Sequence, residues 1–319
     1  PLWSGAVAGA VLVSLYCIAG GIRASIWTDA AQSIVMFFAM GVLLFVAVMA
    51  LGGMSAAVEQ MQSVEGFMDW LPKNLVFSGW IGGTLFIMSW LFAGLSVIGQ
   101  PHIMVRFMTL NNLASMRQAK WWYYLSFTLF YGMATGVGLL SRIYLSDAGS
   151  FDPELALPTM AQQLLPSVLV GLILAGIFAA TMSTADSLVL SCSASVTHDI
   201  LPHKIEKTGL LKLATIMIAG IALLLALTNN QSVFSMVIMA WSSLASAFAP
   251  LLIFLCFGKR PSQFICITAM LTGFTVALGW RVFGLSDMVY EGLPGILAGI
   301  IILYAGCLFR SEIPLRIPV

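Results

Sequence analysis

Hydroxyl and carboxylate side chains recur at helical spacing inside one apolar stretch, Ala175–Ile200. Asp186 and Ser187 follow Ser183 at three and four residues, and Ser191 follows Ser187 at four, which places all of them on one face of a helix. A carboxylate at membrane depth is costly unless a cation or a polar partner meets it. Oxygen atoms of this kind are the ligands that hard cations prefer. A hydrogen bond to its own helix is the alternative for any one serine, but for the whole cluster we predict a cation site.

A second aspartate, Asp29, lies near the start of another apolar segment and is followed at helical spacing by Gln32 and Ser33. Two interpretations are open. A carboxylate near a helix N-terminus is stabilised by the free N–H groups and the helix dipole. Alternatively, Asp29 is a cation ligand or an exit-path residue that is reached through Asp186.

The composition indicates a membrane protein built from helices. Of the 319 residues, 60% are hydrophobic and 8% are charged, whereas about 25% are charged in a soluble domain. The net charge of +1 gives no reason to expect a nucleic-acid partner. Phosphate-binding glycine loops, nucleophile–histidine–acid sets and metal-binding His/Cys spacings are absent from the sequence. We therefore predict an all-α polytopic membrane protein, in contact with the lipid bilayer, that is not an enzyme.

Nine segments approach the roughly 20 apolar residues that span a bilayer. The first two are joined only by a tight turn at Gly20–Arg23, and we predict a single transmembrane domain over residues 1–319. Because the chain opens with Pro1 inside an apolar segment, we expect it to be a fragment that lacks an N-terminal part. The nine segments are about 2–20, 26–51, 79–105, 121–145, 164–195, 210–228, 232–257, 263–284 and 292–309.

Lysine and arginine are distributed unequally over the connections between these segments. Three of them (Lys73, Arg142 and Arg281) fall on one side, and the remaining eleven fall on the other. The basic side is predicted to be cytoplasmic, which places the C-terminus inside the cell and most acidic residues outside. The eleven basic residues are Arg23, Arg106, Arg117, Lys120, Lys204, Lys207, Lys212, Lys259, Arg260, Arg310 and Arg316.

Two further apolar stretches have distinctive residues. Gly99 and Pro101 predict a break within segment 79–105, and such breaks are tolerated at membrane depth where they line a cavity. A broken helix is also a sequence pointer to a transporter binding site.

The small residues of Trp241–Pro250 favour close helix packing. The connection Ser146–Pro166 is either a short external hairpin or gate, or a plain surface loop.

Together these motifs resemble the sodium/solute symporter family, and most of all its sodium/proline symporter branch. The resemblance covers nearly the whole chain, and the motifs occur in the family's order. They are Gly20-Gly21 with Trp27-Thr28-Asp29, Gly99-Gln100-Pro101-His102-Ile103 with Arg106-Phe107-Met108, Asp152-Pro153-Glu154, Ala179-Ala180-Thr181-Met182-Ser183-Thr184, and Ala240-Trp241.

The resemblance implies a five-plus-five inverted-repeat transporter fold, of which this chain would hold the part from the fourth core helix onward. It also implies a sodium ion bound by the backbone carbonyl of Ala180 and the hydroxyls of Ser183 and Thr184. The remaining ligands would come from the first core helix, which is missing here. A second cation site, found in some members, would use Asp29, Ser183, Asp186 and Ser187, and the aspartate at 186 replaces a serine of those members.

The resemblance places the substrate near the helix break, at Ala93, Ser96, Val97, Gln100 and Pro101. Proline transporters carry aromatic residues just before this block, whereas this chain has Ala93 and Val97, with Trp90 one turn earlier. The substrate is therefore predicted only as a small organic solute.

The leading hypothesis is sodium-coupled secondary transport of that solute by alternating access, in the plasma (inner) membrane of a bacterial-type cell. Two alternatives remain: a symporter-like sensor module of a signalling protein, or an ion channel. Polar residues gather in two or three segments and do not follow a continuous pore, which argues against the channel.

Overall fold

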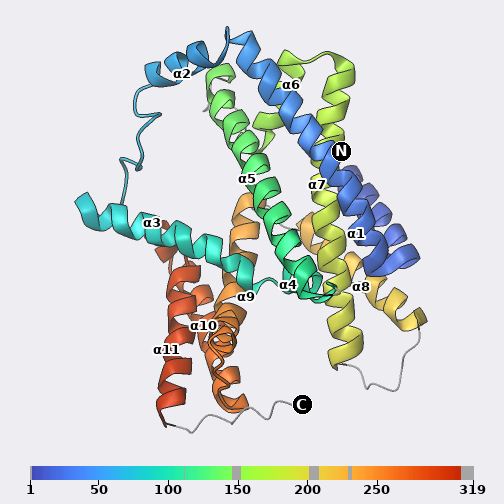
Figure 1. Cartoon of the computed structure of the whole chain (residues 1–319), viewed down its shortest axis with the longest axis vertical. Helices are drawn as coiled ribbons and strands as arrows, with labels where there is room; N and C mark the ends of the chain where they lie inside the picture. Colours follow the sequence, from blue (N-terminus) through green and yellow to red (C-terminus); the bar gives the residue numbers. More distant parts are fainter. Residues whose placement is uncertain (1, 111, 146–151, 201–207, 229–231, 310–319) are drawn as a thin grey trace. The chain divides into compact units, whose positions relative to one another are not determined.

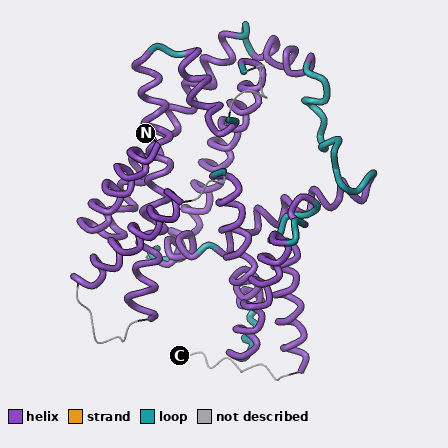
Figure 2. The backbone as a smooth tube through the Cα atoms, turned by 180° about the vertical axis from the view of Figure 1, so that it is seen from behind, coloured by secondary structure: helices purple, strands orange, loops and turns teal. Residues whose placement is uncertain are grey.

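The structure is a computed structural model that describes residues 2–110, 112–145, 152–200, 208–228 and 232–309. Within these ranges the regular structure is entirely helical and no strand is found, as Figure 2 shows. The prediction of an all-α chain is confirmed.

The first helix, α1 (Leu2–Ala50), breaks at Gly21 (Figure 1). Gly21 has φ 56° and ψ −155°, a conformation that glycine adopts without a steric penalty. A Cβ atom on neighbouring Gly20 would collide with the Cβ of Ala24. α1 therefore consists of two helices joined at the turn that the sequence predicted.

Seven helices of the described chain are long and apolar enough to cross a membrane. One of them is α1, which contains two of the predicted segments, and Gly292–Leu308 forms an additional, shorter apolar helix. Counting both halves of α1 and this shorter helix gives nine segments among the residues described, as predicted.

The chain divides into two compact units. Unit 1 comprises residues 1–69 and 110–230, and unit 2 comprises residues 70–109 and 231–319. The elements of unit 1 are α1, α2 (Met54–Ser63), α5 (Leu113–Tyr144), the 3-10 turn η2 (Pro153–Leu155), α6 (Ala156–Leu164), α7 (Ser167–Ala194), the π-helical turn η3 (Ser195–Ile200) and α8 (Thr208–Thr228). Those of unit 2 are α3 (Gly79–Leu95), the 3-10 turn η1 (Ser96–Gly99), α4 (Pro101–Met108), α9 (Val233–Cys256), α10 (Gln263–Val282), the 3-10 turn η4 (Leu285–Asp287) and α11 (Gly292–Phe309). That the whole chain is one transporter domain stays a prediction.

Unit 1 is organised around the packing of α1 against α7. The two helices approach closely at Gly176, where an added Cβ would lie 2.8 Å from the Cβ of Ala39. Leu43 on α1 and Leu140 on α5 are almost fully buried in the same apolar core. α6 buries Met160 and Ala161 in this core, so the second half of the Ser146–Pro166 connection is a packed helix and not a plain surface loop.

In unit 2, small residues bring α9, α10 and α11 together. A Cβ on Gly273 would meet the carbonyl of Ser246, and one on Gly299 would lie 2.7 Å from Cγ of Pro250. Ala245 and Ser246 are fully buried. The prediction that Trp241–Pro250 serves close helix packing is confirmed.

The predicted membrane orientation stays a prediction. Several of the charged residues on which it depends lie outside the described part of the chain, namely Lys204, Lys207, Arg310 and Arg316, as do the first residues of the Ser146–Pro166 connection.

Candidate functional site

The predicted sodium ligands occupy one turn of α7 in unit 1. The hydroxyls of Ser183 and Thr184 both donate hydrogen bonds to the carbonyl oxygen of Ala180, at 3.0 and 3.2 Å. Three oxygen atoms are thereby held within one helical turn. Ser183 is half-buried and Thr184 is exposed, so the cluster is open on the Thr184 side within its unit. Such oxygens can hold a hard cation when their lone pairs turn toward it.

Asp186, one turn further along α7, is fully buried with a relative exposure of 0%. Its Oδ1 accepts a hydrogen bond from the hydroxyl of Ser187 at 3.1 Å, and that hydroxyl also donates to the carbonyl of Ser183 at 2.6 Å. Oδ2 is buried and has no hydrogen-bond donor among the residues that the structure describes. Burying a carboxylate oxygen without a partner is strongly unfavourable, so this position suits a cation.

The first half of α1 lies beside this cluster. The hydroxyl of Tyr16 donates a hydrogen bond to the carbonyl of Met182, at 3.1 Å. Tyr16 and its neighbour Cys17 lie within electrostatic range of both Asp186 and Asp29. α1, on both sides of its break, and α7 therefore place two carboxylates around one region of unit 1.

Asp29 itself is half-buried on the second half of α1. That helix resumes after Gly21, so Asp29 lies about two turns inside it. Free N–H groups and the helix dipole act mainly within the first turn. The alternative reading of Asp29 as a helix-capping carboxylate is therefore not supported.

The predicted break in unit 2 is confirmed. α3 gives way to η1 at Ser96, Gln100 is extended with φ −90° and ψ 109°, and α4 begins at Pro101. Gly99 lies against α9, because an added Cβ would collide with the backbone of Ala245. The break is thus packed directly on the neighbouring helix.

The residues predicted to hold the substrate all surround this break, but they differ in accessibility. Ala93, Val97 and Pro101 are half-buried, whereas Ser96 and Gln100 are buried. The Gln100 amide nitrogen donates to the carbonyls of Ser96 and Trp241, at 3.1 and 3.3 Å. That donor therefore bridges the broken helix to α9.

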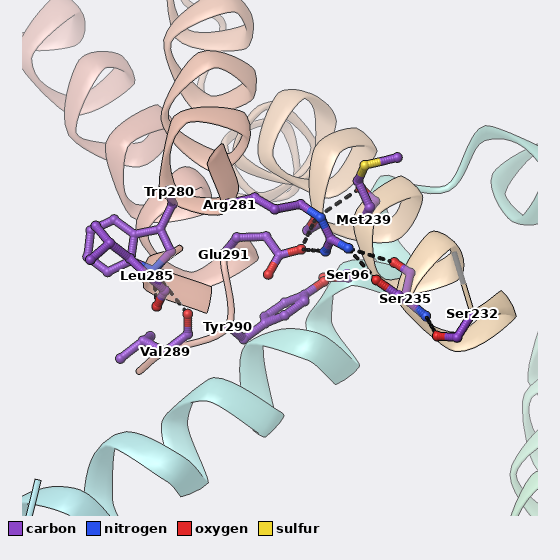
Figure 3. Close-up of polar contacts among 11 residues, drawn as sticks. Ser96, Ser232, Ser235, Met239, Trp280, Arg281, Leu285, Val289, Tyr290 and Glu291 are labelled. Carbon is purple, nitrogen blue, oxygen red and sulfur yellow. Dashed lines mark hydrogen bonds and ion pairs between the residues drawn. The ribbon is translucent and has the colours of Figure 1, made fainter. Parts of the chain in front are cut away.

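A polar network that the sequence did not reveal joins α9, α10 and the chain just before α11 (Figure 3). Arg281 forms an ion pair with Glu291 at 2.8 Å and donates hydrogen bonds to the carbonyl and hydroxyl of Ser235. The hydroxyl of Ser242 donates to the same Glu291 oxygen, at 3.2 Å. Sequence reasoning placed Arg281 and Glu291 only as charges on an external connection. The one sequence feature that could have indicated this ion pair is the opposite charge of Arg281 and Glu291 at the two ends of a short connection.

Tyr290 extends this network to the broken helix. Its hydroxyl is 2.9 Å from that of Ser96, and its backbone N–H donates to the hydroxyl of Ser89, at 3.3 Å. Burial raises the pKa of Tyr290 to about 12, the Glu291 carboxylate acts in the same direction, and the hydrogen bond with Ser96 opposes both. The phenol is therefore neutral at physiological pH and can donate a proton to this hydrogen bond.

Comparison with known proteins agrees with this architecture. The model of the sodium:solute symporter family matches residues 2–273. The high-affinity proline transporter PutP of Bacillus subtilis (strain 168) is 28% identical over 301 residues, which are 91% of this chain and 62% of the relative. The sodium/proline symporter of Escherichia coli (strain K12) is 30% identical over 313 residues, 93% of this chain and 60% of the relative. The chain thus spans about three-fifths of the length of these relatives.

A solved structure, described as the substrate-bound outward-open state of a Na+-coupled sialic acid symporter, superposes with a TM-score of 0.76 at 20% identity. The match covers 98% of this chain and 68% of that chain. The helical segments and the broken helix therefore have the five-plus-five inverted-repeat fold, of which this chain holds a part. The chain belongs to the sodium:solute symporter family.

Proposed function

We propose that the protein is a sodium-coupled symporter that imports a small organic solute by alternating access. The observation that carries the proposal is the oxygen cluster on α7, where the Ser183 and Thr184 hydroxyls converge on the carbonyl of Ala180. Membership of the family and the names of the relatives support the same reading.

In the proposed mechanism, sodium binds to the Ala180 carbonyl and to the hydroxyls of Ser183 and Thr184. Both hydroxyls release their hydrogen bonds to the carbonyl, so that their lone pairs face the ion. A second cation is held by Asp29, Asp186 and Ser187, which gives the buried Asp186 carboxylate the positive partner that a charge in this position needs.

The solute is proposed to bind at the break in unit 2, against Ala93, Val97 and Pro101. Ser96 and Gln100 are proposed to contact the solute through their backbone groups. Their side chains form hydrogen bonds within unit 2 and so stabilise the shape of the break. Sodium drives uptake only if it and the solute favour the same state of the protein. Each must then raise the affinity of the other by the same factor.

Uptake into proteoliposomes tests this function. The protein is reconstituted at its full natural length, and labelled amino acids including proline, sugars and carboxylates are offered with and without an inward sodium gradient. Accumulation of one solute only with the gradient supports symport and names the substrate. Sodium binding without uptake of any compound favours the sensor, and a sodium current that needs no solute favours the channel.

The proposed location is the plasma (inner) membrane, with the C-terminus in the cytoplasm. Cysteine-accessibility labelling at Lys73→Cys and Lys212→Cys tests the orientation, because these two positions are predicted to lie on opposite sides. Labelling of Lys73→Cys from the outside and of Lys212→Cys only after permeabilisation is the expected pattern. The reverse pattern would contradict the orientation.

A further inference from the structure

Unit 2 contains a cavity of about 420 Å³ that extends beyond the residues proposed to bind the transported solute. Its walls are α3, the first two turns of α9, the end of α10, the η4 segment before α11, and the loop before α3. Binding pockets for small molecules typically measure about 300–1,000 Å³, so its volume suits a compact solute. Of the residues predicted to hold the transported solute, Ala93 is the one that also lines this cavity.

The charges around the cavity are unbalanced in favour of a cation. Arg281 lines the wall, but its guanidinium is already paired with Glu291 and hydrogen-bonded to Ser235. Asp287 is a further carboxylate in the lining, and it is exposed. The three charged lining residues therefore sum to one negative charge. An anionic ligand would meet the Asp287 carboxylate and an Arg281–Glu291 pair that carries no net charge.

Aromatic rings make up much of the remaining wall. Phe86 and Trp90 stand one turn apart on α3 with their ring centroids 6.3 Å apart, edge to face. Phe234 and Tyr290 line the same cavity from α9 and from the chain before α11. The faces of such rings attract cationic nitrogen, tryptophan most strongly.

We propose that this cavity is a second ligand site, which takes a small compound with an alkylated cationic nitrogen. The nitrogen binds against Trp90 and Phe86, and Asp287 supplies the carboxylate that balances its charge. Two sources share this chemistry: an organic cation, or the cationic end of a zwitterion. The Arg281–Glu291 pair fixes the wall and leaves no free positive charge to repel the nitrogen.

Matched pairs of probes isolate the charge on nitrogen. Choline and glycine betaine represent the cation and the zwitterion, and each is paired with the analogue in which carbon replaces the nitrogen. Binding is measured by ligand-observed NMR on the purified chain in neutral detergent, in sodium-free potassium buffer. We expect choline, betaine or both to bind about tenfold more tightly than their carbon analogues. Binding of choline alone identifies an organic-cation site, and binding of betaine identifies a zwitterion site.

Substitutions of residues that line the cavity test whether the probe binds there. Trp90→Leu is expected to weaken binding of the charged probe about tenfold, and Asp287→Asn about threefold because that carboxylate is exposed. Trp80→Leu is the matched control, since Trp80 lies on the same helix, is exposed and does not line the cavity. Phe86→Leu is a second test of the wall should Trp90→Leu fail to fold.

Equal binding of the charged probes and their carbon analogues would overturn the proposal. So would equal effects of Trp90→Leu and Trp80→Leu, because the probe would then lie elsewhere. The site is independent of the proposed symport function: Ser183→Ala in unit 1 is expected to leave choline and betaine binding unchanged. If the protein shows no sodium-driven uptake but still binds choline or betaine, the proposed symport function is contradicted and the proposed second ligand site is still supported.

Discussion

Two buried carboxylates, one in each unit, have opposite surroundings. Glu291 in unit 2 is 2% exposed and receives Arg281 at 2.8 Å and the Ser242 hydroxyl at 3.2 Å. Asp186 in unit 1 is 0% exposed, and its Oδ1 accepts from Ser187 while no described residue donates to Oδ2. The first carboxylate has its cation built into the protein. For the second, the partner that we propose is a bound cation.

We propose that this difference separates a structural charge, Glu291, from a ligand-binding one, Asp186. Both carboxylates are too buried to be stabilised by bulk water, so each needs a compensating positive charge. At Glu291 the chain supplies a guanidinium and closes the network. At Asp186 the Ser187 hydroxyl donates to the carboxylate, and a hydroxyl can orient a carboxylate but cannot neutralise it. Neutralising Glu291 should therefore destabilise the protein, whereas neutralising Asp186 should stabilise the sodium-free protein.

The largest expected effect is that of Glu291→Gln. It leaves the Arg281 guanidinium, 22% exposed, without its counter-charge, and breaking such a pair from one side costs roughly 2–3 kcal/mol at this degree of burial. The thermal unfolding midpoint in detergent should fall clearly below that of the wild type, with or without sodium. The double variant Arg281→Met with Glu291→Leu should recover most of the loss, because no charge is then left unpaired. An unchanged midpoint in Glu291→Gln would show that the pair is not structural.

Asp186→Asn is expected to act in the other direction. Removing an uncompensated buried charge should stabilise the sodium-free protein by about 1 kcal/mol. The same change should abolish the stabilisation that sodium gives the wild type, since bound ligand raises stability only where it still binds. Unfolding midpoints in sodium and potassium chloride measure both effects. A variant that is destabilised equally in both salts would mean that Asp186 has a protein partner, as Glu291 has.

A smaller effect is expected from Ser183→Ala and Thr184→Ala. Each removes one proposed sodium ligand, and loss of a polar ligand is worth about 1 kcal/mol or more, or about fivefold in the sodium concentration for half-maximal uptake. Ser193→Ala on the same helix is the matched control, because that buried hydroxyl donates to the Val189 carbonyl of its own helix and is not among the proposed sodium ligands. Sodium activation that is unchanged in both test variants would remove α7 from the sodium site.

Sequence reasoning anticipated those features of the fold that depend on local chemistry. The Gly21 turn and the break at Gly99 and Pro101 follow from backbone preferences, and the length of α7 follows from its apolar run. Helical spacing also placed Ser183, Asp186 and Ser187 on one face. It could not say how deeply that face is buried, because burial depends on the packing of α1 against α7. In the structure Asp186 is fully buried while Thr184, two residues earlier, is exposed.

The Arg281–Glu291 network depended wholly on tertiary structure. Both residues read from the sequence as ordinary charges on an external connection. Only the close packing of α9, α10 and α11, permitted by residues such as Gly273 and Gly299, brings Ser242 and Ser235 to them. No spacing along the chain signals a partner that lies 46 or 49 residues away. Sequence alone therefore singled out Asp186, the carboxylate that we propose to bind a cation, and missed Glu291, the carboxylate that is paired with Arg281.

Asp29→Asn is expected to give the smallest change in stability of these variants. It tests whether Asp29 belongs with Asp186 or with Glu291. Asp29 is half-buried, so water already compensates part of its charge and its removal should shift the unfolding free energy by less than about 1 kcal/mol. Sodium affinity, measured as the sodium concentration for half-maximal uptake, should nevertheless change several-fold, because Asp29 and Asp186 act on the same region of unit 1. A variant with normal sodium activation would leave Asp186 as the sole acidic ligand. A variant that fails to fold would instead place Asp29 with Glu291, among the charges that serve structure.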